Sequence, residues 1–414
     1  METHDVTIVG GGIVGICSAL SLQERGIRVR LIEKDDPGQA TSFGNAGVIS
    51  PWSIIPHSTP GFWKIIPKLM LTGWRPLSVC LASWPSMIPW GLKFLSNGTE
   101  RNTRNIAYSM SLLCAPSIDL YRKHLNGTGH EYLVKDTSYL QLIRRAKDAN
   151  LDDLTYQIRL QKGAKIEIVK GSSLHSLEPA LSFKFEAGIV IHNIARSLSP
   201  GRLSTVLAMK SKAQGAEIIK DQIIGIHRDG NTWFLKGKMS KYTTKSLVIS
   251  AGAWSRDLLL NIGVSVPLMN ERGYHIHCAD PEIEVKNSVV FPEGGVIASS
   301  MECGLRVAGQ AEFGSIDAPM DPKRKAILSS IALEMFPDIS LRKTKVWMGH
   351  RPSFPDSLPV IGSVPNQPNL FVNFGHSHHG LMMAPKSGEL LANTLTHNSG
   401  NEDTSSVSIM RFLN

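Results

Sequence analysis

The chain has 414 residues, which is enough for two or three domains of ordinary size, and we expect two. Hydrophobic residues make up 42% and charged residues 19%, which is typical of a compact globular protein and argues against a disordered or fibrous one. The net charge of +9 comes from scattered lysines and arginines without a helix-turn-helix, zinc-finger or RNA-binding signature, so we expect no nucleic-acid partner.

The cysteines indicate a reducing compartment. There are five of them, an odd number, widely spread and without a C-x-x-C pair: Cys17, Cys80, Cys114, Cys278 and Cys303. This pattern predicts neither a disulfide framework nor a zinc site. The first predicted strand begins at residue 6, and no basic stretch, apolar stretch or cleavage site of a secretory signal stands before it. We therefore expect a cytoplasmic protein.

A tryptophan-rich segment follows the first fifty residues. Residues 76–92 carry no charge, but they are too few and too often interrupted by proline for a transmembrane helix. Five tryptophans lie close to Lys64, Lys68, Arg75 and Lys93, and they are Trp52, Trp63, Trp74, Trp84 and Trp90. Two interpretations stay open: a proline-rich cap over the core, or an interfacial patch for a membrane or a partner.

The N-terminus is typical of a dinucleotide site. An apolar strand over residues 6–9 leads into Gly10-x-Gly12-x-x-Gly15, an amphipathic helix, and a second strand over residues 29–33. In such a βαβ unit Gly10 allows the tight turn, Gly12 lets the backbone approach a pyrophosphate, and Gly15 lets helix and strand pack closely.

An acid ends the second strand of this unit. Glu33 is at the position where a carboxylate accepts hydrogen bonds from the adenosine ribose hydroxyls. Ile13 and Val14 at the start of the helix, and Lys34 after the acid, complete the predicted contacts of this half of the dinucleotide.

The next loop points to a flavin. Residues 40–50 are rich in small and hydroxyl side chains, and this stretch resembles the FAD-dependent D-amino acid oxidase superfamily, in particular its amino acid dehydrogenase branch. The resemblance implies that the loop runs along the ribityl chain and under the isoalloxazine ring. The implied contacts are Thr41, Ser42, Asn45, Ala46, Gly47 and Val48.

Two later segments resemble the same family. The stretches 215–255 and 347–381 imply further FAD contacts, with Ile223 meeting the adenine through its backbone and a helix after residue 380 facing the flavin C2 carbonyl. The implied contacts in these stretches are Ile223, Ala251, Gly252, Trp254, Gly349, Arg351, Gly375, His376, His379, Gly380 and Leu381.

The resemblance covers residues 5 to about 397 and implies an α/β fold: a Rossmann-like FAD-binding domain with a discontinuous mixed-sheet α+β substrate domain. The FAD-binding domain is expected to comprise residues 1–50, 199–265 and 346–414. The substrate domain is expected to comprise residues 51–198 and 266–345.

Three residues are predicted to contact the substrate: Arg351, Tyr274 and His378. Arg351 matches the position at which related amine oxidoreductases hold a substrate carboxylate, and a bidentate guanidinium would aim the hydrogen on Cα at flavin N5. By strand alternation, either Tyr274 or its neighbour His275 should face the substrate. Because the flavin accepts the electrons, we expect positioning rather than a catalytic base.

We expect no metal and noncovalent FAD. His376, His378 and His379 lie on one turn without carboxylate or cysteine partners at ligand spacing. His350 stands close to the position where sarcosine-type oxidases of the family carry a flavin-linking cysteine.

The sequence therefore predicts an FAD-dependent dehydrogenase of a small amino or imino acid, with a D-amino acid favoured and D-proline or a hydroxyproline as candidates. The alternatives are a glycine or sarcosine-type oxidase that uses oxygen, and a flavin subunit that passes electrons to a membrane quinone or a partner protein. The electron acceptor (quinone, partner flavoprotein or oxygen) stays open, as does peripheral contact with the inner face of the membrane.

Overall fold

Strands from three distant parts of the chain form the first sheet of the computed structural model, which describes residues 4–398 and 403–413. The strand order is β18-β19-β12-β1-β2-β8, and only the edge pair β18 and β19 is antiparallel. The strands in this order are β18 (Val360–Ser363), β19 (Leu370–Phe374), β12 (Ser246–Ile249), β1 (Val6–Val9), β2 (Val29–Glu33) and β8 (Glu217–Lys220).

The predicted βαβ unit is confirmed, with helix α1 (Ile13–Gln23) between β1 and β2. The central strands are almost wholly apolar because the sheet is covered on both faces. On one face α1 packs against α8 (Pro200–Ala213) and α11 (Gly380–Leu395). On the other face a small antiparallel sheet and α9 (Ser255–Leu260) complete the core. The small sheet consists of β9 (Ile223–Asp229), β10 (Thr232–Gly237) and β11 (Lys241–Thr244).

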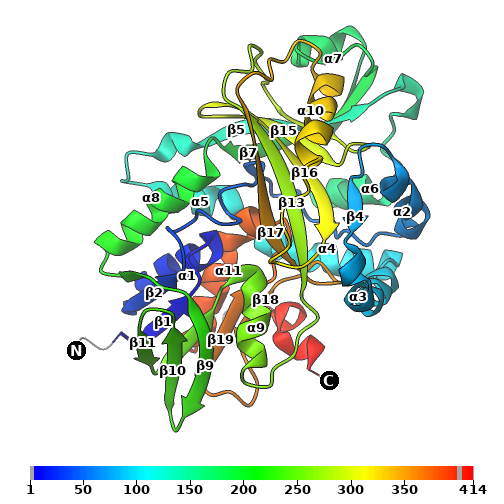
Figure 1. The fold of residues 1–414 in the computed structure, drawn as a ribbon. Helices are drawn as coiled ribbons and strands as arrows, with labels where there is room; N and C mark the ends of the chain where they lie inside the picture. Colours follow the sequence, from blue (N-terminus) through cyan, green and yellow to red (C-terminus); the bar gives the residue numbers. More distant parts are fainter. Residues whose placement is uncertain (1–3, 399–402, 414) are drawn as a thin grey trace.

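A larger mixed sheet builds the second half of the molecule (Figure 1). Its main path is β17-β13-β16-β15-β14-β5-β7-β3, with β4 beside β16 and β6 beside β7. The bounds are β3 (Val48–Ile49), β4 (Leu77–Val79), β5 (Val134–Ile143), β6 (Ile166–Lys170), β7 (Ala187–Ser197), β13 (Met269–Cys278), β14 (Ser288–Phe291), β15 (Val296–Met301), β16 (Gly304–Phe313) and β17 (Thr344–Ser353).

Parallel and antiparallel pairs both occur in this sheet, so the predicted fold class is confirmed. Strands β3 and β17 belong to the larger sheet, although the predicted limits place residues 48–49 and 346–353 in the FAD-binding domain. The domain limits themselves stay a prediction.

Helices cover the flanks of the larger sheet. α10 (Arg324–Met335) packs against β13 and β17, while α2 and α3 lie at the sheet's outer edge beside β4 (Figure 1). The other helices are α2 (Phe62–Leu71), α3 (Trp84–Ser96), α4 (Glu100–Cys114), α5 (Ser117–Leu125), α6 (Leu154–Gln161) and α7 (Ser172–Leu177). Of these, α4 and α5 pack against α11 of the first half. Within the described ranges no helix is long and apolar enough to cross a bilayer.

A buried arginine fastens the edge segment to the sheet. The Arg324 guanidinium donates to Ser78 Oγ at 2.5 Å and to the Arg75 carbonyl at 3.0 Å. Its third partner is Gln310 Oε1, at 2.9 Å. The segment carrying α2, β4 and α3 is therefore held at β4 by a fully buried cation.

Candidate functional site

The turn after β1 leaves an open space in front of α1. Gly10 has φ +112°, and a Cβ there would lie 2.3 Å from the Ser250 carbonyl oxygen, so only glycine fits. A Cβ on Gly15 would lie 1.9 Å from the Gly10 carbonyl oxygen, which explains the close packing of helix and strand. Gly12 differs, because its Cβ would meet only Ser42 Oγ, at 3.3 Å. A side chain at Gly12 would fill the open space in front of α1, where the sequence predicts the pyrophosphate.

The N-terminus of α1 has free capacity for an anion. Ile13 N–H donates to Ser42 Oγ at 2.9 Å, and the first turn of the helix contains no acidic residue. Backbone N–H groups and the helix dipole favour negative charge at this point. The Ser42 hydroxyl lies in front of the N-terminus of α1, where a phosphate oxygen could accept a hydrogen bond from it.

Glu33, the residue predicted to contact the adenosine ribose, ends β2 beside this turn. Its carboxylate accepts hydrogen bonds from the Gly11 N–H at 2.5 Å and from the Asp35 N–H at 3.2 Å. Burial raises the pKa of Glu33, and these hydrogen bonds oppose the increase. Beside it, the Lys34 ammonium lies 4.5 Å from the centre of the Trp254 ring.

A cavity of about 1020 Å³ runs from this turn into the region between the two sheets. Most predicted cofactor contacts line it: Gly10, Gly12, Ile13, Val14, Glu33, Lys34, Thr41, Ser42, Asn45, Ala46, Val48, Ile223, Ala251, Gly252, Trp254, Gly349, Arg351, Gly375, His376, His379, Gly380 and Leu381. Gly15 and Gly47 are not among the lining residues. Gly15 packs between α1 and β1, and Gly47, at φ +76°, faces the Ser197 carbonyl oxygen.

Arg351 reaches across the sheet into this cavity. It lies on β17 directly opposite Glu271 of β13, and its Nη1 donates to Glu271 Oε1 at 2.7 Å and to the Gln310 carbonyl at 2.7 Å. A Cβ on Gly273 would lie 2.2 Å from Arg351 Nη2, so the glycine makes room for the guanidinium. The Arg351 side chain is 18% exposed. Arg351 is thus a cation in the cavity wall, already paired with a carboxylate.

Tyr274 and His275 are both buried and lie on opposite faces of β13. The Tyr274 hydroxyl donates to Glu312, which is ion-paired with Arg272, and its ring lies over Arg324. His275 Nδ1 lies 2.9 Å from the Gly44 carbonyl oxygen, and its ring stacks on Trp347. Of the two, Tyr274 lines the cavity. Because its hydroxyl already has a partner, its contact with substrate stays a prediction.

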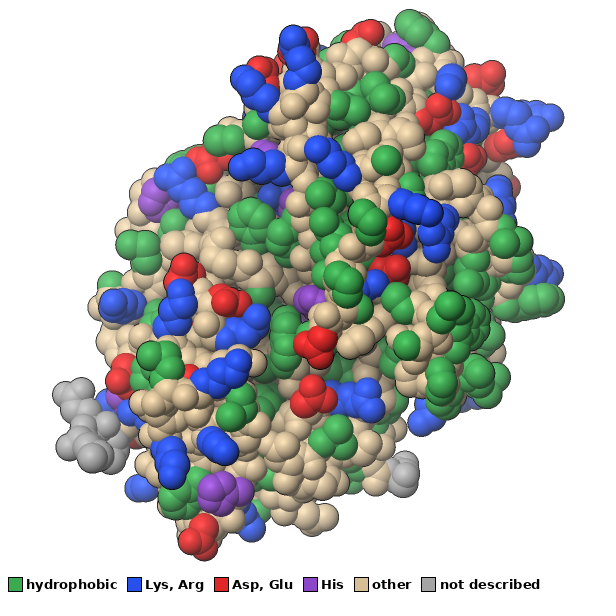
Figure 2. Space-filling view, in the orientation of Figure 1, with side chains coloured by type: hydrophobic (Ala, Val, Ile, Leu, Met, Phe, Trp, Pro, Cys, Tyr) green, Lys and Arg blue, Asp and Glu red, His purple; other side chains and the backbone are tan. Residues whose placement is uncertain are grey.

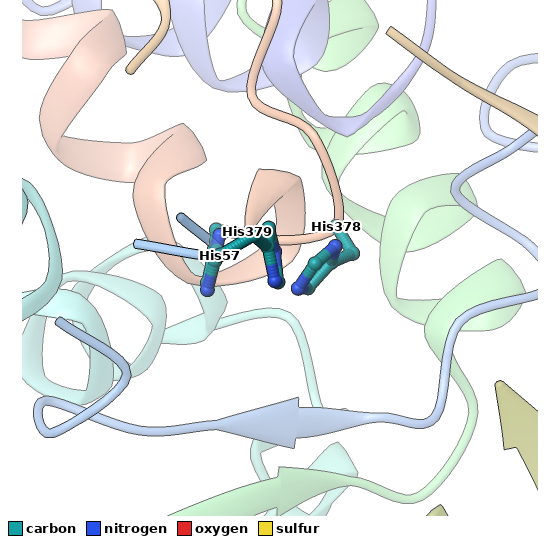
Figure 3. Close-up of side chains that lie close together, drawn as sticks. All are labelled: His57, His378 and His379. Atoms are coloured by element: carbon teal, nitrogen blue, oxygen red, sulfur yellow. The ribbon is translucent and has the colours of Figure 1, made fainter. Parts of the chain in front are cut away.

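Three histidines lie close together in the cavity wall (Figure 3), and the charge of Arg351 acts on His57 and His378. His378 and His379 come from the turn before α11, and His57 comes from the loop after β3. The ring centres of His57 and His378 are 3.7 Å apart, and those of His378 and His379 are 4.5 Å apart. His376, predicted on the same turn, points elsewhere, with its Nε2 3.2 Å from Ser387 Oγ.

Burial keeps these imidazoles neutral. It lowers the pKa of His57 to about 4, with Glu271 opposing and Arg351 reinforcing the decrease. Burial also holds the pKa of His379 well below the ordinary value, and the pKa of His378, whose ring is exposed to the cavity, is lowered in the same direction by desolvation and by the neighbouring rings. His57 Nε2 and His379 Nδ1 are buried without a protein partner. The cavity wall therefore offers lone pairs on neutral rings close to a guanidinium.

The same three rings have candidate metal-ligand atoms within 4.8 Å of one another. Neutral imidazoles are suitable ligands, but the Arg351 guanidinium repels positive charge at His57 and His378. A dication would be disfavoured so close to a fixed cation. The absence of a metal stays a prediction.

Sequence reasoning missed Glu271 and His57. Glu271 stands two residues before Gly273 on the strand predicted to face the substrate, so both residues lie on the same face of that strand. An acid on this face was a signal that the sequence offered. His57 lies in a proline-rich loop far from the histidine turn in sequence, and no spacing pattern connects the two.

The chain matches the family model described as DAO, FAD dependent oxidoreductase, over residues 5–394. A D-amino-acid oxidase from Bradyrhizobium diazoefficiens is 31% identical over 404 residues, which cover 95% of this chain and 96% of that protein. Among solved structures, glycine oxidase from Geobacillus kaustophilus has a TM-score of 0.75 at 21% identity, with full coverage of both chains. L-proline dehydrogenase from P. horikoshii has a TM-score of 0.74 at 19% identity and covers 98% and 97% of the two chains.

Proposed function

We propose, on the premise that the chain belongs to the family of FAD-dependent oxidoreductases, that it dehydrogenates a small amino or imino acid. A D-amino acid is the favoured substrate, and D-proline or a hydroxyproline are candidates of suitable size. The observation that carries the proposal is the guanidinium of Arg351 in the cavity wall, next to neutral histidines with free lone pairs. Such a wall suits a carboxylate and a nitrogen on the same carbon.

FAD fits the residues of the cavity. The open face of Gly12, the Ile13 N–H and the Ser42 hydroxyl suit the pyrophosphate, and Glu33 suits the ribose. The N-terminus of α11, at Gly380, lines the cavity and would face the flavin pyrimidine edge. When bound, FAD supplies the hydride acceptor at its N5 atom.

We further propose that FAD is held without a covalent bond. No cysteine occurs among the described residues that line the cavity. His350, at the position where some relatives carry a linking cysteine, has its Nδ1 3.2 Å from Asn270 Oδ1 and its ring edge-on to Trp254. Both contacts occupy the imidazole within the protein.

Arg351 is proposed to bind the substrate carboxylate through a planar two-donor fork. Glu271 holds one guanidinium nitrogen and fixes the direction of the fork, while the Ser353 hydroxyl donates to the other Glu271 oxygen at 2.7 Å. The lowered pKa values keep the histidines neutral, so each ring has one nitrogen that can accept a hydrogen bond. They would therefore orient the substrate nitrogen and leave the removal of its proton to solvent.

The electron acceptor is proposed to be a quinone or a partner flavoprotein, with oxygen as the alternative that a glycine or sarcosine-type oxidase would use. We propose a cytoplasmic location, either free or at the inner face of the membrane, and the five cysteines are all free thiols. Oxygen consumption during turnover, compared with reduction of a soluble quinone, distinguishes the acceptors.

One experiment tests the substrate class. The purified holoprotein is mixed without oxygen with D- and L-amino acids, imino acids and hydroxy acids, and flavin absorbance is followed near roughly 450 nm. We expect bleaching by small D-amino or imino acids. Bleaching by hydroxy acids alone would exclude the proposed nitrogen-containing substrate.

A further inference from the structure

An apolar surface extends along α2, β4 and α3, and we call residues 62–95 the docking surface. Figure 2 shows hydrophobic side chains gathered over α3. Large side chains that are exposed here include Trp63, Ile65, Leu71, Leu81, Ile88 and Leu92. Leu71 and Leu81 are 84% and 88% exposed. Contiguous apolar surface of this kind marks an interaction site.

The helix α2 packs only loosely on the rest of the chain, through β4 and the ring of Phe94. None of its ten residues is buried, although most of them are hydrophobic. In α3 only Trp90 is buried. An amphipathic helix gains most of its stability by burying its apolar face. The exposed apolar side chains of α2, which are Trp63, Ile65 and Leu71, are therefore open to a contact outside this chain.

The charged residues of the docking surface itself are all basic, and one of them, Arg75, lies 3.9 Å from the carboxylate of Asp321. Between Asp36 and Glu100 the sequence contains no acidic residue, whereas Lys64, Lys68 and Lys93 are exposed on α2 and α3. Tryptophan and lysine side by side are typical of helices that lie in a membrane interface. Anionic lipid headgroups complement this combination directly.

The cavity opens through the same surface. Ile65, Ile88 and Leu92 are exposed and also line the cavity that reaches Gly12. A bilayer on this surface would cover the cavity mouth with acyl chains. A molecule dissolved in the lipid could then enter the cavity without crossing water.

We propose that α2, β4 and α3 form a monotopic docking surface for an anionic lipid bilayer, with the aromatic and aliphatic side chains in the interface and the lysines at the headgroups. The uniform positive charge favours lipid over a second copy of the chain, because two copies would bring like charges together. The residues changed in the test below, Lys64, Lys68, Leu71 and Leu81, do not line the cavity, so docking is tested independently of the substrate.

Vesicle co-sedimentation of the full-length holoprotein tests the proposal. We expect binding to vesicles of phosphatidylcholine and phosphatidylglycerol, and much weaker binding to phosphatidylcholine alone or at high salt. Leu71→Ser with Leu81→Ser should weaken binding by about tenfold or more, because both side chains lose apolar contact with lipid. The pair Lys64→Gln and Lys68→Gln should reduce the preference for the anionic vesicles.

A matched control uses apolar side chains exposed elsewhere. Phe183 and Met239 are 86% and 79% exposed and lie outside the docking surface, so Phe183→Ser with Met239→Ser should bind vesicles like the wild type. The docking proposal fails if the wild type does not sediment with anionic vesicles, if both pairs of variants behave alike, or if the surface instead forms dimers in analytical ultracentrifugation. Flavin reduction by substrate is measured in parallel. Normal reduction without vesicle binding would refute docking alone, and binding without reduction would refute the proposed function alone.

Discussion

Arg351 and Glu271 face each other on neighbouring strands, and their side chains form an ion pair of 2.7 Å in the wall of the cavity. Two main-chain carbonyls, of Gly309 and Gln310, hold the same guanidinium from the next strand. The cation is thus fixed before any ligand arrives, which lowers the entropic cost of capturing a carboxylate. If Arg351 binds a carboxylate as proposed, Glu271 competes with that carboxylate for the positive charge.

Replacing Glu271 by glutamine should therefore tighten the binding of a simple carboxylate. Gln keeps the size of the side chain but removes a negative charge beside the guanidinium, and we expect acetate to bind on the order of tenfold more tightly. The measurement is a titration of the holoprotein with acetate, followed by the change in flavin absorbance. Unchanged or weaker acetate binding would show that Glu271 does not oppose anions at Arg351.

A side chain at Gly12 should prevent retention of FAD. Gly12→Val would place branched carbon atoms in the space in front of the α1 N-terminus. Gly73→Val is the matched control, because a Cβ at Gly73 meets no protein atom within 4 Å and Gly73 lies far from this turn in sequence. The flavin-to-protein absorbance ratio after purification should be near zero for Gly12→Val and normal for Gly73→Val. A normal ratio in both would place the cofactor elsewhere.

Acid should release the cofactor intact. Because no cysteine lines the cavity within the described ranges, precipitation with trichloroacetic acid should leave yellow FAD in the supernatant. Chromatography of the supernatant identifies it. Colour that stays in the pellet would mean a covalent link, and peptide mapping would then examine His350 first.

Stability should fall in mildly acidic solution. The folded protein holds the pKa of His57 at about 4, below the ordinary value near 6.5, so the folded state favours the neutral ring. The stabilisation is complete above about pH 6.5 and is lost as the pH falls toward about 4, because the unfolded chain binds the proton first. Urea midpoints at about pH 7 and about pH 5 measure the loss. In His57→Asn unfolding should take up about one proton fewer, so the urea midpoint should change less between the two pH values than it does in the wild type. An equal change in both proteins would contradict the burial argument.

The parts of the structure that local sequence determines were predictable. The strand, glycine turn, helix and second strand of residues 6–33 follow from hydrophobic periodicity and from two glycines. At both Gly10 and Gly15 a Cβ would clash with the backbone, so only glycine fits there. Most of the other residues that line the cavity were predicted from the resemblance to the family, because the resemblance relates segments that lie far apart in the sequence.

Contacts made by the tertiary fold were not predictable in this way. His57 joins the histidine turn only because β3 pairs with β7 and carries the next loop under α11. The Tyr274 hydroxyl finds Glu312 on the neighbouring strand, where the register contains a bulge. Strand alternation could place Tyr274 and His275 on opposite faces of the strand, but it could not predict which residues contact each face.

The measurement closest to the central claim compares flavin reduction by substrate in the wild type, Arg351→Ala and Arg351→Lys. FAD should stay bound in all three, because Arg351 is assigned to the substrate carboxylate. Losing a charged hydrogen-bonded contact costs about 1.5–3 kcal/mol, so the reduction rate per substrate concentration should fall roughly tenfold or more in Arg351→Ala. Arg351→Lys should recover only part of it, since an ammonium cannot form the two-donor fork. Equal reduction of all three flavins would contradict the assignment of the carboxylate to Arg351.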